Sequence, residues 1–292
     1  KSYSSPTQIP GTWSWVQGSH SNMVFGIKTD GTGWAWGRNA SGGLGIGDNT
    51  ERSSPTQVPG TWSSGQAGYH SVFVTDSNGG RSAGANLSGE LGLNSRTYYN
   101  TPQTIPGTWT AMGRGQDYSM GSKNGGKNLF MWGAGGYGRL GRSLPPGSPY
   151  FRNRSSPMQI PGYVAWDPAN TTSQGSNFNY NALVMRTDGT LWAWGANTYG
   201  ALGQNQAPAQ LSGYSSPVQL SGTTWNQIAT YDDGGRLATR SDGTAWTWGY
   251  NANGGLGLND TVNYSSPVQL SGTNWTGDIG GKSTSFFALR SS

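Results

Sequence analysis

One motif recurs along the chain and restricts the folds open to it. The segment "DGTLWAWGANTYGALG" (188–203) ends in a glycine-rich tail, which returns as "WGRNASGGLG" (36–45), "AGANLSGELG" (83–92), "WGAGGYGRLG" (132–141) and "WGYNANGGLG" (248–257). A second marker, Ser-Ser-Pro or Asn-Thr-Pro, has its prolines at positions 6, 55, 102, 157, 217 and 267. Two markers in phase at about fifty residues identify an internal repeat of small structural units.

Each unit has the pattern of short β-strands separated by turns. In "NMVFGIKTDGTGWAWG" (22–37) two apolar runs meet at Asp30-Gly31, and the same pair returns at 188–189 and 242–243. Asp-Gly between apolar runs predicts a tight hairpin, because both residues tolerate a positive φ. The tryptophans of W-x-W-G stand two positions apart, which places them on one face of a strand. No window has the apolar period of a helix.

These features predict an all-β single domain over residues 1–292, a β-propeller with one sheet per blade and essentially no helix. The units start near residues 4, 53, 100, 155, 215 and 265. The last unit stops before its own W-x-W-G strand. We therefore expect about six four-stranded blades, closed by pairing of the two chain ends, or seven blades if the chain is trimmed.

The repeats resemble those of the regulator-of-chromosome-condensation family. The likeness rests on G-x-H-S, a D-G turn and W-x-W-G-x-N-x-x-G-x-L-G, and it covers nearly the whole chain. It implies a propeller of four-stranded blades, usually seven, with functions that range from guanine-nucleotide exchange on chromatin to ultraviolet-B perception and β-lactamase inhibition. The photoreceptor's Gly-Trp-Arg-His-Thr motif is absent, since the matching stretches read "GSHSN" (18–22) and "GYHSV" (68–72). In style the repeats are similar to those of bacterial surface proteins and phage structural proteins.

Composition favours a protein of an exterior surface. Charged residues make up 11% of the chain, against about 25% in a typical domain, and the implied surface is rich in Ser, Thr, Asn and Gly. We therefore expect an extracellular or virion-surface location. The net charge of +5 is scattered, so no basic run suggests nucleic acid as a partner. The chain has no Cys, and no apolar run approaches the roughly 18 residues of a membrane helix.

Twelve of the fourteen tryptophans occupy slots of the repeat. A side chain needed in every unit is most simply an anchor that packs neighbouring blades together. With the leucine of the tail, these slots predict nine blade anchors: Trp36, Trp132, Trp194, Trp248, Leu44, Leu91, Leu140, Leu202 and Leu256. Trp15 and Trp166 break the pattern and are candidates for exposed contacts. The alternative interpretation of the tryptophans is a ligand site in each blade.

No group of residues points to catalysis, a cofactor or a metal. His20 and His70 both occupy the G-x-H-S slot, where we expect a histidine that hydrogen-bonds a turn. Asp30, Asp188 and Asp242 are turn residues, and the other carboxylates suggest no converging acid–base pair. Serine-nucleophile, phosphate-loop and dinucleotide motifs are absent. We therefore expect no enzyme activity and no cofactor.

Three expansions distinguish the third and fourth units: "RSLPPGSPYFRNR" (142–154), "WDPANTTSQGSNFNYN" (166–181) and "QNQAPAQLSGY" (204–214). Insertions in repeat proteins map to loops, often on a binding face, and Arg beside Tyr and Phe is typical of protein interfaces. The candidate partner-binding residues are Arg142, Tyr150, Phe151, Arg152, Arg154, Trp166, Asn177, Phe178, Tyr180 and Tyr214. Drift of exposed loops is the alternative explanation.

The leading hypothesis is a non-catalytic protein-binding propeller on an exterior surface. The favoured setting is a phage virion or tail, and the favoured partner is a virion or cell-surface protein. The alternative is a lectin-like, carbohydrate-binding propeller of a secreted or cell-surface bacterial protein, which requires one exposed Trp per blade. A regulator of the guanine-nucleotide-exchange type is a third hypothesis, less favoured than the protein-binding and the lectin-like hypotheses. Nucleic acid and membrane insertion are not expected, and the oligomeric state stays open.

Overall fold

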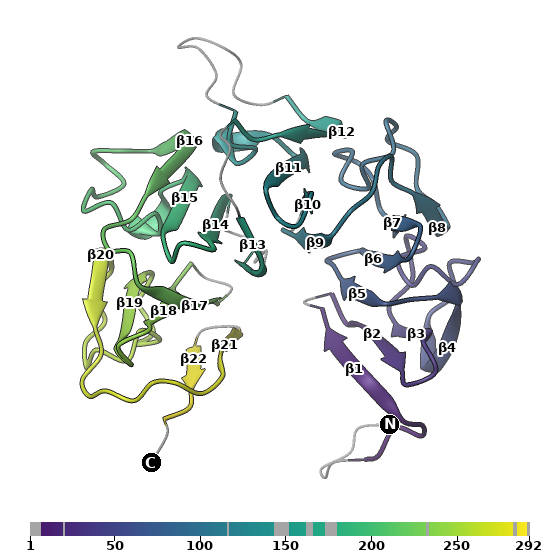
Figure 1. The fold of residues 1–292 in the computed structure, drawn as a ribbon, viewed down its shortest axis with the longest axis horizontal. Helices are drawn as coiled ribbons and strands as arrows, with labels where there is room; N and C mark the ends of the chain where they lie inside the picture. Colours follow the sequence, from purple (N-terminus) through teal and green to yellow (C-terminus); the bar gives the residue numbers. More distant parts are fainter. Residues whose placement is uncertain are drawn as a thin grey trace.

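Sheets of antiparallel strands follow one another along the chain and stand side by side around a common centre (Figure 1). The computed structural model describes residues 7–19, 21–115, 117–142, 152–161, 166–172, 180–231, 234–282 and 285–290. Within these ranges there are five four-stranded sheets and one two-stranded sheet, each made of strands that are consecutive in sequence. Helical structure in the described residues is limited to two short 3-10 turns. The prediction of an all-β propeller with four-stranded blades is confirmed.

We number the sheets one to six in chain order. Sheet one holds β1 (Trp13–Gly18), β2 (Met23–Lys28), β3 (Thr32–Gly37) and β4 (Arg52–Thr61), and sheet two holds β5 (Ser64–Ala67), β6 (Ser71–Asp76), β7 (Gly79–Gly84) and β8 (Tyr99–Thr104). Sheet three holds β9 (Ala111–Arg114), β10 (Tyr118–Lys123), β11 (Asn128–Gly133) and β12 (Arg154–Gln159), and sheet four holds β13 (Trp166–Thr172), β14 (Asn181–Arg186), β15 (Leu191–Ala196) and β16 (Gly213–Gln219). Sheet five holds β17 (Trp225–Thr230), β18 (Arg236–Arg240), β19 (Ala245–Gly249) and β20 (Tyr264–Gln269), and sheet six holds β21 (Ile279–Lys282) and β22 (Ser285–Ala288). The turns η1 (Gly136–Gly138) and η2 (Thr198–Gly200) follow β11 and β15.

A short relay of hydrogen bonds fixes the hairpin between the second and third strands. In sheet one, Oδ1 of Asp30 accepts from the backbone N–H of Thr32 at 2.8 Å and from its hydroxyl at 2.6 Å. The Thr32 hydroxyl oxygen accepts in turn from the indole N–H of Trp34 at 2.8 Å. The same relay is present at Asp188, Thr190 and Trp192 and at Asp242, Thr244 and Trp246. These aspartates are turn residues, as predicted, and each hairpin orients the first tryptophan of its own W-x-W-G.

The second tryptophan of W-x-W-G joins a sheet to the one before it. Its indole N–H donates to a backbone carbonyl in the preceding tail: Trp132 to Glu90 at 2.8 Å, Trp194 to Arg139 at 2.8 Å, and Trp248 to Ala201 at 3.1 Å. Each acceptor residue directly precedes the Leu-Gly of its tail. The three indoles are fully buried, so an unbonded N–H there would cost free energy.

The last glycine of each tail leaves room for this contact. Gly203 has a φ of +67°, and a Cβ there would lie 2.9 Å from Nε1 of Trp248 and 2.8 Å from Leu220. The tail of sheet five differs, because a Cβ on Gly257, whose φ is +71°, would meet nothing nearer than Leu270 at 3.6 Å. Within the described residues, the junction surface of this last tail is therefore uncovered.

The predicted anchors form the core between sheets, with one exception. The leucines of the tails and Trp132, Trp194 and Trp248 are at most 5% exposed. Trp36 is only half-buried, because no described sheet precedes sheet one and could cover it with a tail. The prediction that Trp36 is a buried anchor between two sheets is therefore wrong. All fourteen tryptophans are described, and Trp15 alone is exposed. Full or partial burial is therefore confirmed for most tryptophans, as expected for side chains that pack the sheets. The lectin-like alternative required one exposed tryptophan in each blade, and that requirement is not met.

In four of the five four-stranded sheets that the structure describes, the hairpin between the second and third strands also holds a basic side chain against aromatic rings, which was not predicted. The ammonium nitrogen of Lys28 lies 5.4 Å from the ring centroid of Trp13 and 3.8 Å from that of Trp34. Equivalent stacks form around Lys123, Arg186 and Arg240. Contacts of this kind contribute about 0.5–1 kcal/mol each at exposed sites. The signal in the sequence is a Lys or Arg directly before the turn.

The two ends of the described chain lie on the same side of the molecule (Figure 1). Strands β21 and β22 pair with each other, and within the described residues neither pairs with β1, which pairs with β2. Residues 1–6, which would be needed for the predicted closure of the ring, lie outside the described residues. Closure by pairing of the ends stays a prediction.

Candidate protein-interaction face

The strand order gives the molecule two opposite faces with different connections. We call "loop face" the edge that carries the turns from first to second strands and the loops from third to fourth strands. We call "hairpin face" the edge that carries the hairpins from second to third strands and the connections between sheets. The register shows the two edges in sheet one: Gly37 pairs with Met23 at the loop face, and Trp13 pairs with Lys28 at the hairpin face.

All three expansions of the sequence reach the loop face. Residues 142–154 and 204–214 connect β11 to β12 and β15 to β16, and residues 166–181 run from β13 through the turn to β14. Antiparallel neighbours reverse direction at every connection, so first-to-second and third-to-fourth connections share an edge. The topology therefore gathers the expansions on one face. Residues 143–151 and 173–179 of these segments lie outside the described residues.

A buried asparagine organises most loops of this face. In sheet four, Oδ1 of Asn197 accepts from the backbone N–H of Leu202 at 3.2 Å, and its Nδ2 donates to the carbonyls of Gln206 at 2.8 Å and Leu211 at 3.2 Å. Asn39, Asn86 and Asn251 hold their own loops in the same way. These four loops are thus held by internal hydrogen bonds to the asparagine side chain.

Two tyrosines project from equivalent positions of the loops in sheets three and four. Tyr137 and Tyr199 have φ values of 58° and 57° and are 52% and 41% exposed. Tyr137 stacks on Tyr180 with ring centroids 5.0 Å apart, and Tyr199 lies 4.8 Å from Tyr250. Sequence reasoning missed both projecting tyrosines, although they share one slot in "GGYGRLG" and "NTYGALG". Tyrosine is enriched among the residues that contribute most of the binding energy near the centres of protein interfaces.

A buried polar cluster ties sheets three, four and five together beneath this face. The Tyr118 hydroxyl donates to the carbonyl of Asn181 at 2.7 Å, and Nη2 of Arg236 donates to Oδ1 of Asn181 at 2.6 Å. Burial lowers the pKa of Arg236 to about 10 and raises the pKa of Tyr118 to about 12. At neutral pH the guanidinium is therefore charged and the phenol is neutral, which matches their roles as donors.

Arginines add positive charge near the projecting tyrosines. The guanidinium of Arg139 lies 4.4 Å from the ring centroid of Tyr180, and its Nε donates to the carbonyl of Gly136 at 3.0 Å. Burial lowers the pKa of Arg139, whereas Arg142 and Arg152 are exposed. Tyrosine with arginine is a common composition at protein interfaces.

The other predicted contact residues divide into two groups, those that are half-buried and those that lie outside the described residues. Arg154 is half-buried at the start of β12. Tyr214 is half-buried as well, because its ring packs against the core and its hydroxyl donates to Oε1 of Gln206 at 3.0 Å. Both are less available than predicted. Tyr150, Phe151, Asn177 and Phe178 lie outside the described residues.

Trp166 corrects one prediction outright. It is 1% exposed, with its ring centroid 6.1 Å from that of Trp194. Its backbone N–H donates to the carbonyl of Gly126 in the preceding hairpin at 2.9 Å, as that of Trp225 does to Gly189 at 3.0 Å. Trp166 is therefore the regular first-strand tryptophan of sheet four. A longer spacer after Pro161-Gly162 hid it from the sequence pattern.

The described residues offer no arrangement of side chains for metal chemistry. Among them, no group of three or more His, Cys, Asp and Glu side chains could hold a metal ion. Their helices, both single 3-10 turns, are too short to cross a membrane. His20 lies outside the described residues.

Known proteins share both the repeat and the arrangement of sheets. The family model for the regulator of chromosome condensation (RCC1) repeat matches residues 30–74, 188–230 and 242–279. Prp20p from Saccharomyces cerevisiae is 16% identical with a TM-score of 0.75, over 93% of this chain and 68% of that one. Human WBSCR16 is 17% identical with a TM-score of 0.76, over 95% and 71% of the two chains. Yeast RCC1 (Prp20) bound to Kap60 is 17% identical with a TM-score of 0.77, over 93% and 65%.

This chain spans about two thirds of the length of those proteins. At such low identity the likeness concerns the fold. The matched repeats and the shared arrangement of four-stranded sheets together show that the chain is an RCC1-like repeat β-propeller.

Proposed function

We propose that this propeller is a non-catalytic binding protein whose loop face contacts another protein. The observation that carries the proposal is the pair of exposed tyrosines, Tyr137 and Tyr199, held at equivalent positions on neighbouring loops. Arg142 and Arg152 extend the same face, and three sequence expansions converge on it. Tyrosine and arginine contribute more binding energy than most residues at protein interfaces, because they bury large areas and donate directed hydrogen bonds.

The structural relatives support a protein partner. Prp20p has been described with its binding properties to Gsp1p and histones, and yeast RCC1 has been described bound to Kap60. The low charged fraction of this chain, 11%, supports an exterior setting, which we propose to be a phage virion or tail. The partner would then be another virion protein or a cell-surface protein.

Site-directed cross-linking tests the proposal. The chain has no cysteine, so a single introduced cysteine carries a photo-cross-linker at one known position. Arg142→Cys and Arg152→Cys place it on the loop face, and Thr223→Cys places it at an exposed position on the hairpin face as the matched control. In the native assembly we expect protein cross-links from the first two variants and none from the third.

A double variant then measures how much Tyr137 and Tyr199 contribute to the affinity for the partner. Asn tolerates a positive φ better than other side chains, so Tyr137→Asn with Tyr199→Asn removes both rings with little backbone strain. We expect Kd for the cross-linked partner to rise by at least about tenfold. Equal cross-linking from both faces, or an unchanged Kd, would reject the loop face as the binding surface.

The likeness to Prp20p favours a second candidate, an exchange-type regulator. Its direct probe is purified Gsp1p, the protein whose binding has been described for Prp20p. Under our proposal Gsp1p does not bind this chain. Saturable binding of Gsp1p, weakened by the double tyrosine variant, would favour the regulator instead.

A further inference from the structure

A pocket opens where the first strands of three neighbouring sheets meet, away from the loop face. It has a volume of about 620 Å³ and is lined from β1, β5 and β9, with side chains of β2 and β6 behind them. Ser14, Ser63, Ser64 and Thr110 stand near the hairpin-face ends of these strands, and all four are exposed. This volume is within the range of about 300–1,000 Å³ that is usual for small-molecule sites.

The hydroxyls of the pocket are arranged mainly as acceptors. Ser14 donates its hydroxyl proton to the carbonyl of Ile27 at 2.9 Å. In the same way Ser63 donates to the carbonyl of Thr75 at 3.1 Å, and Thr110 to the carbonyl of Ser122 at 3.0 Å. Ser63 and Thr110 also contact the hydroxyls of Thr75 at 3.2 Å and Ser122 at 3.0 Å. A hydroxyl has one proton and two lone pairs, so each oxygen keeps at least one lone pair for a ligand. The pocket therefore suits a ligand that presents several donors.

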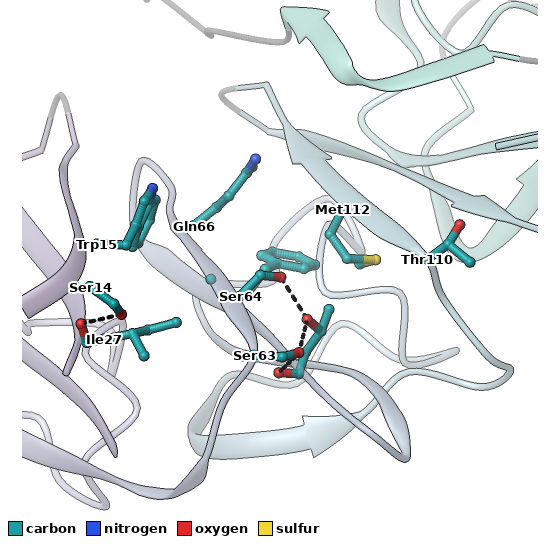
Figure 2. A pocket seen from close by; sticks show the side chains of 11 residues that line it. Ser14, Trp15, Ile27, Ser63, Ser64, Gln66, Thr110 and Met112 are labelled. Carbon is teal, nitrogen blue, oxygen red and sulfur yellow. Dashed lines mark hydrogen bonds between the residues drawn. The ribbon is translucent and has the colours of Figure 1, made fainter. Parts of the chain in front are cut away.

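One aromatic ring and one amide complete the site. Trp15 is 36% exposed, whereas every other tryptophan of the chain is more buried. The Trp15 ring leans on Phe25 with a centroid distance of 6.2 Å. Figure 2 shows the side chains of Trp15 on β1 and Gln66 on β5, the first strands of neighbouring sheets, extending in the same direction. Among the described residues the Gln66 amide has no hydrogen-bond partner, so it can both donate to a ligand and accept from it.

The lining is uncharged, which limits the ligand class. Among the described residues that line the pocket none is ionisable, although the chain carries a net charge of +5. A phosphate or carboxylate would lose its hydration there without gaining a counter-charge. A neutral ligand with many hydroxyl donors and one apolar face satisfies the acceptors and the ring together. Saccharides have that chemistry, since the C–H groups on one side of a pyranose form an apolar surface.

We propose that this pocket is a saccharide site, in which one pyranose of a short neutral oligosaccharide stacks on Trp15 beside Ser14 and Gln66, and its further units donate hydroxyl hydrogen bonds to Ser63 and Thr110 along the pocket (Figure 2). The site is separate from the loop face, so it does not depend on the proposed protein partner. It also differs from the lectin hypothesis drawn from the sequence, because it uses one exposed tryptophan and not one per blade.

Saturation-transfer NMR on the full chain tests the proposal. The probes are glucose, galactose, mannose and N-acetylglucosamine, their short oligomers, and a neutral Gly-Ser peptide as an uncharged hydrogen-bonding control. We expect saturable transfer to at least one saccharide, with the ring C–H protons closest to the protein. Trp15→Ala and Gln66→Ala should each weaken that binding by at least about tenfold, whereas Tyr137→Asn on the loop face should leave it unchanged.

Further variants allow the test to be read even if one substitution prevents folding. If Trp15→Ala does not fold, Trp15→Phe, which keeps an aromatic ring beside Phe25, and Gln66→Ala replace it as tests of the site. The proposal is overturned if no saccharide binds saturably, if binding is unchanged in Gln66→Ala or in a folded Trp15→Ala, or if the Gly-Ser peptide competes equally. None of these outcomes affects the test of the loop face, which is read from protein cross-links.

Discussion

At the residue scale, tryptophan performs two different tasks within one W-x-W-G motif. The first ring is oriented by the Asp-Gly hairpin of its own sheet, and the second donates to a carbonyl of the preceding sheet. The repeat pattern alone predicts that both rings pack. It cannot separate their tasks, because the acceptors of Trp132, Trp194 and Trp248 lie 42 to 55 residues away in the sequence.

The junction hydrogen bond can be tested by removing the indole N–H. Trp194→Phe keeps an aromatic ring but leaves the buried carbonyl of Arg139 without its donor, which costs about 1–3 kcal/mol of unfolding free energy. Trp36→Phe is the control, because Trp36 is half-buried in sheet one and should lose less. Urea denaturation of both variants measures the difference. Equal losses would show that the bond to Arg139 contributes nothing of its own.

The hairpin aspartates predict how stability depends on pH. The hydroxyl and then the backbone N–H of Thr32 hold the pKa of Asp30 below its usual 3.8, and Thr244 does the same for Asp242. A pKa lowered by folding means that the stabilisation is complete above the unfolded value of 3.8 and is lost as pH falls through the folded value. The urea concentration at the unfolding midpoint should therefore fall between neutral pH and pH values below 3.8. In the double variant Asp30→Asn with Asp242→Asn, this fall should be smaller than in the unmodified protein. An unchanged fall would contradict the assignment.

Single positions also mark the limit of sequence reasoning. Trp166 appears irregular in the sequence because three residues separate it from Pro161-Gly162, whereas one or two do so elsewhere. Its backbone bond to Gly126 shows that slots are defined by strand pairing, which a lengthened spacer does not disturb. The half-burial of Trp36 has a similar cause, since burial depends on which sheet stands next to it.

At the scale of elements, the glycine-rich tail is the part that inserts between sheets. Gly203 and Gly257 occupy the same slot with φ values of +67° and +71°, so an alanine costs similar backbone strain at both. A Cβ at Gly203 would press on Trp248 and Leu220, but at Gly257 it would meet nothing closer than 3.6 Å. Gly203→Ala should therefore destabilise the protein by about 1–3 kcal/mol more than Gly257→Ala. Similar thermal melts of the two variants would contradict the junction role of the tail.

The sequence located the expanded loops but not their surface residues. Hairpins, repeat slots and the three insertions all followed from turn chemistry and spacing. Their convergence on one face needs the strand order, and the exposure of Tyr137 and Tyr199 needs the path of the loops. The stacks of Lys28 and Arg240 on tryptophan likewise arise from cross-strand pairs that the sequence specifies only once the register is known.

At the scale of the whole molecule, sheet six is the weakest part of the described structure. It has two strands, and Phe287 on β22 is 60% exposed. Local opening costs least where few buried contacts hold the backbone. We expect amides of β21 and β22 to exchange with deuterium faster than those of β1 and β2, which also lie near a chain end but belong to a four-stranded sheet. Equal protection of the two regions would indicate that further contacts complete sheet six.

The acceptor at each sheet junction is a backbone carbonyl, supplied in turn by Glu90, Arg139 and Ala201. An acid, a base and a methyl group serve equally well, because the peptide oxygen is the same in all three. The hydrogen bond between sheets therefore does not depend on which side chain the acceptor residue carries. Copies of the module can diverge at that position, or be duplicated and exchanged, while the architecture that joins them stays intact.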